Sequence, residues 1–138
     1  MPPEPTRDTD RTATPEEVVD RFIACVVAMD LDGACDLVTD DLEYDNVPMG
    51  KNHGPEGLKA FLGPMVGGLD EVEFVILRQT ATGRTVMNER VDRFRVGDRW
   101  MDLPVAGVFE VTEDGRISLW RDYFDMGTLM TQMAELSA

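Results

Sequence analysis

The sequence predicts an α+β fold in which a curved, mostly antiparallel sheet forms a cone, packed by N-terminal helices around a deep pocket. Helical patterns dominate the first half of the chain, whereas strand-like segments joined by tight turns fill most of the second half. Strands joined in this way form an antiparallel meander. Glycines that interrupt the long strands favour a sheet that curls, and helices over a curled sheet enclose a pocket.

The chain begins with a polar, proline-rich stretch, and the first helix follows it. We expect residues 1–13 to form a flexible N-terminal arm and residues 14–138 to form a single cone-shaped domain. Thr14 and Glu17 fit a capping box, which marks the start of a helix. Apolar residues then recur at a spacing of three to four up to about Met29, which indicates an amphipathic helix.

Shorter elements follow the first helix. We expect a second helix over residues 33–38 and a short strand over residues 42–47. Prolines and glycines in residues 48–55 indicate an irregular loop. A third helix is expected over residues 56–66, where two glycines end it. Because these helices precede the long strands, they can cover one face of the sheet.

The second half of the chain is predicted to contain four strands and a last helix. Turn signals that contain a glycine separate the strands. The strands are expected over residues 72–81, 85–96, 100–112 and 117–124, and the helix over residues 127–136. Proline cannot donate a backbone hydrogen bond, so Pro104 predicts an edge or a bulge within the third of these strands.

The composition argues against several classes of function. With 27 acidic and 13 basic side chains, the net charge of −14 disfavours binding to nucleic acid or to anionic lipid. The opening residues lack a signal-peptide pattern and no run of 18 apolar residues exists, so we expect a cytoplasmic protein without a membrane segment. Two cysteines and a lone histidine, His53, lack the spacing of a zinc site, so no metal or other cofactor is expected.

One predicted strand carries two charges on a face that is apolar at both ends. Alternate side chains of a strand share a face, which places Arg90 and Asp92 between Val86 and Phe94. A buried charge is costly unless it is paired and hydrogen-bonded. Either this strand is exposed on both faces, or Arg90 and Asp92 lie at the floor of a cavity.

Two other strand segments repeat this pattern. Tyr44 and Asn46 share a face of an earlier strand, and Asp122 lies between Trp120 and Phe124. If the three faces meet inside the cone, burial and like charge raise the pKa of one aspartate, while the arginine holds the pKa of the other down. A protonated and an ionised aspartate, beside a tyrosine and an asparagine that hold a water molecule, can add water to a substrate by acid–base catalysis.

Four motifs together resemble the limonene-1,2-epoxide hydrolases. The motifs are Tyr44-x-Asn46-x-Pro48, Glu89 to Asp92, Gly107 to Phe109 and Trp120 to Asp125. The resemblance extends over most of the chain, from about Pro15 to Met133. It implies the cystatin-like cone fold, which this family shares with nuclear transport factor 2 and SnoaL-type polyketide cyclases. It also implies a homodimer that pairs across the sheet.

The resemblance further implies a role for each of the five polar residues. Asp122 matches the general base, Asp92 the acid that protonates the epoxide oxygen, and Arg90 the arginine that bridges them. Tyr44 and Asn46 match the residues that position the water molecule. The implied activity is cofactor-independent, one-step hydrolysis of a lipophilic epoxide to a vicinal diol. Apolar positions that match the pocket lining of the family are Ile23, Val26, Leu62, Met65, Phe94, Leu103, Val105 and Phe124.

Two other functions remain open on the same fold. A SnoaL-like cyclase or a ketone isomerase also uses a carboxylate base and a protonated partner, but it does not need an arginine between two aspartates. A non-catalytic ligand-binding dimer would need none of the acid–base groups. For the epoxide hydrolase that the resemblance implies, the expected partners are a small lipophilic epoxide, water and a second copy of the chain.

Overall fold

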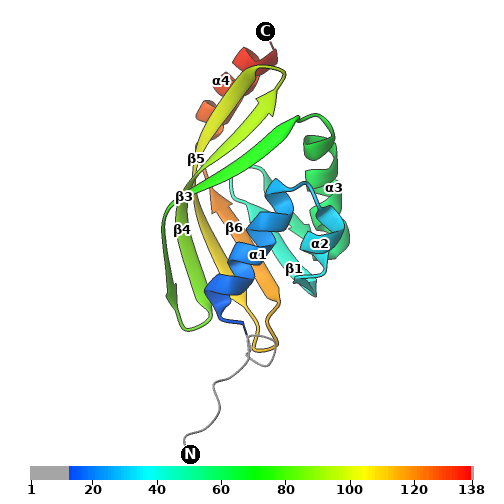
Figure 1. Cartoon of the computed structure of the whole chain (residues 1–138), viewed down its shortest axis with the longest axis vertical. Helices are drawn as coiled ribbons and strands as arrows, with labels where there is room; N and C mark the ends of the chain where they lie inside the picture. Colours follow the sequence, from blue (N-terminus) through cyan, green and yellow to red (C-terminus); the bar gives the residue numbers. More distant parts are fainter. Residues whose placement is uncertain (1–12, 138) are drawn as a thin grey trace, which may run out of the picture.

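The computed structural model describes residues 13–137, and its elements follow the predicted order (Figure 1). The predicted arm lies outside these residues, except for Ala13. Helix α1 lies across one face of a curled, unclosed sheet, and α3 lies on the same side, over β1 (Figure 1). Helix α2 contacts both α1 and α3. Helix α4 packs at the far end of β5. The predicted α+β cone fold is confirmed.

Six strands form the sheet, in the order β2-β1-β6-β5-β4-β3. Their bounds are Val38–Asn46 for β1, Gly50–His53 for β2, Glu71–Thr82 for β3, Thr85–Val96 for β4, Arg99–Val111 for β5 and Ile117–Tyr123 for β6. Strands β3 to β6 form the predicted antiparallel meander. Strand β1 pairs with β6 in parallel, which places the first strand beside the last one.

Strand β2 corrects the prediction for residues 48–55, which we expected to be an irregular loop. Residues 50–53 instead pair with β1 in antiparallel register, and Gly50 enters the strand with a φ of 117°. The side chains of β2 are largely exposed, because it is an edge strand. An edge strand held by backbone bonds needs no apolar alternation, so its sequence carries no strand pattern.

The bounds of the four helices are Pro15–Val27 for α1, Leu31–Cys35 for α2, Gly54–Gly67 for α3 and Met126–Ser137 for α4. Thr14 and Glu17 form the predicted capping box at the start of α1. Asp125 caps α4, since its carboxylate accepts a hydrogen bond of 2.8 Å from the Thr128 N–H. None of the helices within residues 13–137 is long and apolar enough to cross a membrane.

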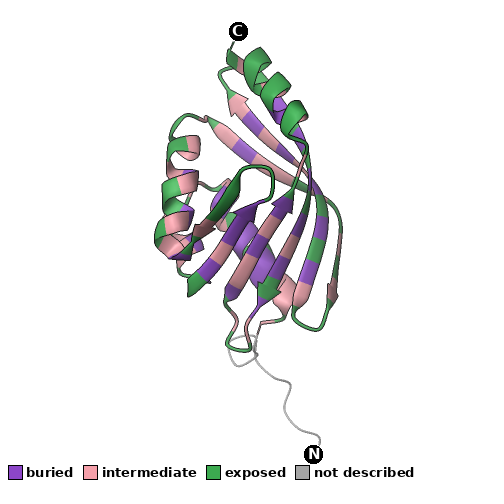
Figure 2. Ribbon diagram, turned by 180° about the vertical axis from the view of Figure 1, so that it is seen from behind, coloured by how far each residue is buried: buried purple, intermediate pink, exposed green. Residues whose placement is uncertain are grey.

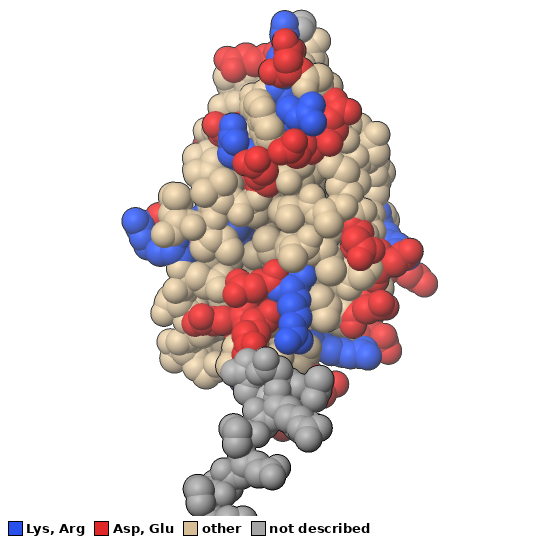
Figure 3. Space-filling view, in the orientation of Figure 1, with Lys and Arg blue, Asp and Glu red and all other residues tan. Residues whose placement is uncertain are grey.

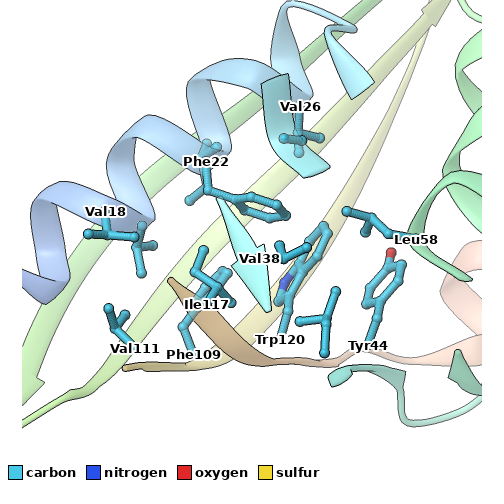
Figure 4. Close-up of a cluster of buried hydrophobic side chains, with 14 of the residues drawn as sticks. Val18, Phe22, Val26, Val38, Tyr44, Leu58, Phe109, Val111, Ile117 and Trp120 are labelled. Atoms are coloured by element: carbon cyan, nitrogen blue, oxygen red, sulfur yellow. The ribbon is translucent and has the colours of Figure 1, made fainter. Parts of the chain in front are cut away.

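The main core lies between α1 and the inner face of the sheet (Figure 4). Phe22 of α1 packs edge-on against Trp120, with 5.1 Å between ring centroids, and against Phe109. Trp120 stacks in turn on Tyr44, with ring centroids 4.4 Å apart. This aromatic cluster fixes the inner faces of β1, β5 and β6 against one another, because large rings bury much apolar area in defined geometries.

Pro104 lies where β5 has a free edge. Strand β5 pairs with β4 along its whole length, but it pairs with β6 only from Ala106 onward. At Pro104 the side toward β6 therefore has no partner strand, and the missing N–H costs no ladder bond. The predicted edge at this proline is confirmed.

Candidate active site

The inner face of β4 carries the charged pair into the interior. Buried and exposed residues alternate along this strand, as the banded colours of Figure 2 show. Arg90 is 0% exposed and Asp92 is 4% exposed. The interpretation in which this strand is exposed on both faces is therefore wrong, and Arg90 needs a partner for each of its N–H groups.

All five N–H groups of Arg90 have acceptors. Its Nε and Nη2 donate to the two carboxylate oxygens of Asp92, at 2.8 and 2.9 Å. Its Nη1 and Nη2 donate to the two oxygens of Asp122 on β6, at 3.2 and 2.8 Å. The remaining Nη1 bond, of 3.0 Å, goes to Oδ1 of Asn88. The guanidinium therefore bridges the two aspartates, as predicted, and a third side chain holds it.

Gly107 makes room for this bridge. On β5 it lies opposite Asn88 of β4 and Asp122 of β6, so it sits under the middle of the cluster. A Cβ atom there would clash with Arg90 Nη1 and would lie 2.9 Å from Asn88 Oδ1 and Asp122 Oδ1. The cluster therefore requires a residue without a side chain at this position.

Strand β1 supplies the other two predicted residues. In the parallel pairing with β6, Tyr44 lies beside Trp120 and Asn46 lies beside Asp122. Both Tyr44 and Asn46 are buried, at 2% and 5% exposed. The Nδ2 group of Asn46 is buried without a hydrogen-bond partner. Because buried donors are nearly always satisfied, this group marks a place for a water molecule or a ligand atom.

Burial perturbs the acid–base groups. It raises the pKa of Asp92 to about 6, although the hydrogen bonds and the charge of Arg90 lower it. Burial also raises the pKa of Asp122, against the opposing effects of Arg90 and of the Trp120 N–H. Burial and then the charge of Asp122 raise the pKa of Tyr44, whose hydroxyl therefore stays protonated. One guanidinium between two buried carboxyls favours retention of one proton by the pair.

A cavity of about 330 Å³ opens beside these residues. Its polar wall is formed by Tyr44, Asn46, Asp92 and Asp122. The remaining wall is almost entirely apolar and includes six of the predicted lining residues, Leu62, Met65, Phe94, Leu103, Val105 and Phe124. Trp120, two residues before the predicted base, also forms part of the wall. Side chains that sequence reasoning did not propose complete it, namely Met49, Phe61, Leu69, Phe74, Met101, Leu129, Met133 and Leu136.

Two predicted lining residues, Ile23 and Val26, lie elsewhere. Both belong to the core cluster between α1 and the sheet, and neither lines the cavity. The apolar stripe of α1, which includes Phe22, packs directly on the rings of Phe109 and Trp120, so its side chains are used for packing. The prediction is wrong for these two positions, because a helix pattern shows that a side chain is buried but not what it faces.

Two hydrogen bonds within the site were missed in the sequence. Asn88 shares the inner face of β4 with Arg90 and accepts one of its hydrogen bonds. Trp120 lines the cavity and also donates from Nε1 to Asp122 Oδ1 at 2.8 Å. Both residues lie two positions from a predicted site residue, so the period of the strand was the signal that could have found them.

The cone fold carries a cluster of buried polar residues at the wall of an apolar cavity large enough for a small molecule. The profile of the limonene-1,2-epoxide hydrolase catalytic domain matches residues 13–135, and the chain belongs to this family. Epoxide hydrolase EphG of Mycobacterium tuberculosis is 38% identical over 108 residues, which cover 78% of this chain and 71% of EphG. The chain is therefore an epoxide hydrolase, and the predicted family resemblance is confirmed.

Solved structures agree with this assignment. An epoxide hydrolase of M. tuberculosis described as limonene-epoxide-hydrolase-like superposes with a TM-score of 0.76 at 33% identity, over 88% of this chain and 90% of that one. A SnoaL-like polyketide cyclase structure from Shewanella denitrificans has a TM-score of 0.78 at 17% identity, over 88% and 97% of the two chains. The second likeness shows the fold alone.

Proposed function

We propose that the chain hydrolyses a lipophilic epoxide to a vicinal diol in one step, with water as the nucleophile and without a covalent intermediate. The observation that carries this proposal is the arrangement of Asp92, Arg90 and Asp122, two buried carboxyls on one fully bonded guanidinium at the polar wall of an apolar cavity. The apolar wall supports a lipophilic substrate, because burial of apolar surface favours such ligands.

The numbers of hydrogen bonds support a proton on Asp92. Asp122 accepts three hydrogen bonds, two from Arg90 and one from the Trp120 indole, whereas Asp92 accepts two. An indole N–H can only donate, so it favours the ionised form of Asp122. Asp92 then holds the proton, and Asp122 is the ionised base.

The water molecule belongs beside Asp122. The unpartnered Nδ2 of Asn46 and the protonated hydroxyl of Tyr44 border the same wall of the cavity as the Asp122 carboxylate. These groups can donate to and accept from one water molecule, which fixes the direction of its lone pair. A water molecule oriented in this way is already positioned as the nucleophile, so the entropic cost of bringing it to the substrate is lowered.

The proposed step moves two protons. Asp122 takes a proton from the water molecule while the water oxygen forms a bond to one epoxide carbon. The C–O bond at that carbon breaks, and the leaving oxygen takes the proton of Asp92 and becomes the second hydroxyl. Asp92 ends ionised and Asp122 ends protonated, so one proton returns from Asp122 to Asp92 before the next turnover. Only epoxide and water are consumed.

The test compares two aspartate variants with a surface control. Asp92→Asn and Asp122→Asn should each lower diol formation from a panel that includes cyclohexene oxide and limonene oxide by at least about a hundredfold. Asp98→Asn, in the exposed turn between β4 and β5, should behave like the wild type. Chiral chromatography measures the diols, and circular dichroism checks the fold.

Isotope labelling tests the absence of a covalent intermediate. A single turnover in ¹⁸O-water should place the label in the diol and none in the protein. Wild-type activity in either aspartate variant, or label that first appears in the protein, contradicts the proposed mechanism. A panel on which the wild type forms no diol contradicts the proposed lipophilic substrate class.

A further inference from the structure

A chain of hydrogen bonds leads away from Arg90 through residues that do not line the cavity. Arg90 Nη1 donates to Asn88 Oδ1, and Asn88 Nδ2 donates to Gln79 Oε1 on β3 at 3.1 Å. Gln79 Nε2 then donates to a carboxylate oxygen of Asp20 on α1, also at 3.1 Å. We call Asn88, Gln79 and Asp20 the amide chain. It connects the buried cluster to an exposed carboxylate on another element.

The amide chain has one direction. Each amide accepts on the side of Arg90 and donates on the side of Asp20, which can only accept. The carboxylate therefore orients Gln79, and Gln79 orients Asn88 so that its oxygen faces Arg90. With the Asn88 amide reversed, two donors would face each other, and a buried N–H of Arg90 would lose its acceptor.

A β-bulge in β3 brings Gln79 into this position. Ile76 lies opposite Arg90, but the register then shifts, so that Arg78 lies opposite Glu89 and Gln79 opposite Asn88. In a regular strand, Gln79 would share the outer face of the sheet. Leu77, the extra residue, is 53% exposed, so the bulge does not serve to bury it. Bulges are known to re-aim side chains next to active sites, and this bulge turns Gln79 inward.

We infer that Asn88 and Gln79 are positioning residues for the hydrolysis, which hold the Arg90 guanidinium in place while negative charge moves from Asp122 to Asp92. This inference rests on the proposed function. Arg90 Nη2 donates to both aspartates, so the guanidinium is drawn toward whichever carboxyl is ionised. A neutral acceptor on a third side, itself anchored through Gln79, opposes that movement. Its effect belongs to the chemical step and not to substrate binding.

The test changes Gln79, the half-buried middle residue of the amide chain. One variant removes its amide, and a second exchanges the amide with the carboxylate of Asp20. Gln79→Leu removes the acceptor of Asn88 and should lower kcat about tenfold with KM unchanged. In the double variant Asp20→Asn with Gln79→Glu, the carboxylate and the amide change places. The carboxylate at position 79 would still accept from Asn88 and from the new amide at position 20, so kcat should return to within about threefold of wild type.

If Gln79 only filled space, Gln79→Leu should be more active than the double variant, because leucine fills the space of glutamine without adding a charge. Thr80→Val, the next residue on β3 but on the outer face of the sheet, is the matched control and should leave kcat unchanged. Asn88→Leu should lower kcat by about a hundredfold. If that buried variant does not fold, the Gln79 variants decide.

Four results would overturn the inference. An active wild type with an unchanged kcat in Gln79→Leu overturns the positioning role alone. The same holds if the double variant is no more active than Gln79→Leu, or if the losses appear in KM. A wild type that forms no diol overturns the proposed function, and with it any role of the amide chain in that reaction.

Discussion

Arg90 shows how a charge is kept in the interior of this protein. A buried ion pair that loses one partner costs about 3–5 kcal/mol, because the other charge stays buried without compensation. Here two carboxylates and the Asn88 carbonyl oxygen satisfy all five donors of the guanidinium, and the centroid of the Phe74 ring lies 4.8 Å from its Cζ atom. The cluster is therefore stable as a set and sensitive to the loss of any member.

Gly107 is the residue at which this sensitivity can be tested without removing a polar group. In Gly107→Ala, the new Cβ atom meets Arg90 Nη1 at the centre of the cluster, so the guanidinium or Asp122 must move. We expect diol formation to fall at least about tenfold and the free energy of unfolding to fall by about 2 kcal/mol. Enzyme assays and urea denaturation measure the two effects.

The matched control for this variant is Gly63→Ala. Gly63 lies in α3 with no atom near the position of a Cβ, so alanine there should leave activity unchanged and add up to about 1 kcal/mol of stability. Wild-type activity in Gly107→Ala would show that the cluster tolerates a side chain at its centre.

At this scale the sequence predicted the positions of the charged residues better than those of the amides. Arg90, Asp92 and Asp122 stand out because a charge among apolar neighbours on one strand face needs an explanation. Asn88 carries no charge and gives no such signal. Gln79 lies on the inner face only because of the bulge at Leu77, and strand alternation alone places it on the outer face.

Helix α1 and strand β5 contribute to the molecule in different ways. The buried side chains of α1 fill the core, whereas Leu103 and Val105 of β5 form part of the cavity wall. Both sets are apolar and buried, so the sequence does not separate them. The distinction depends on where the sheet curls away from α1, which is a property of three-dimensional packing.

A pair of variants can separate these roles. Ile23→Val in α1 should lower the free energy of unfolding by about 1 kcal/mol and leave KM unchanged. Leu103→Ala should enlarge the cavity and raise kcat/KM for bulky epoxides relative to small ones. Urea denaturation and competition between limonene oxide and cyclohexene oxide measure these effects. A changed substrate preference in Ile23→Val would show that Ile23 does line the cavity and would contradict its assignment to the core.

The accuracy of the predicted elements follows the strength of their patterns. Strand β4 has its predicted bounds, because a long alternating run between two glycine turns leaves little choice. Strand β2 was missed because an exposed edge strand is held by backbone hydrogen bonds, which no side-chain pattern records. Strand β1 begins earlier than predicted because Val38 pairs with Ile117 of β6, a contact between distant parts of the chain.

The surface of the whole molecule combines scattered charges with an apolar area on the outer face of the sheet. Acidic side chains predominate over basic ones on the face shown in Figure 3. On the outer face of the sheet, Val75, Val91 and Pro104 lie in register across three strands. Val75 and Met87 are 41% and 50% exposed there. Exposed apolar areas of this kind often mark protein–protein contacts.

We propose that this outer face joins two copies of the chain, which agrees with the homodimer that the family resemblance implies. Light scattering coupled to gel filtration should give the wild type twice the chain mass of 15.4 kDa. Val75→Lys should give a monomer, because a buried unpaired charge opposes association. Met130→Lys, at an exposed methionine of α4, should remain dimeric. A wild type that runs as a monomer at micromolar concentration contradicts this proposal.

Because all donors of Arg90 are occupied, substrate recognition and the holding of the reacting charges fall to different groups of the same cavity. Since the guanidinium has no N–H left over, an incoming carboxylate or phosphate finds two acids and no free cation, so anionic epoxides gain nothing from it. Recognition of the rest of the substrate, away from the reacting oxygen, then depends on its fit to the apolar wall. The apolar wall can be redesigned for substrates of another outline, while the reacting charges keep their arrangement behind it.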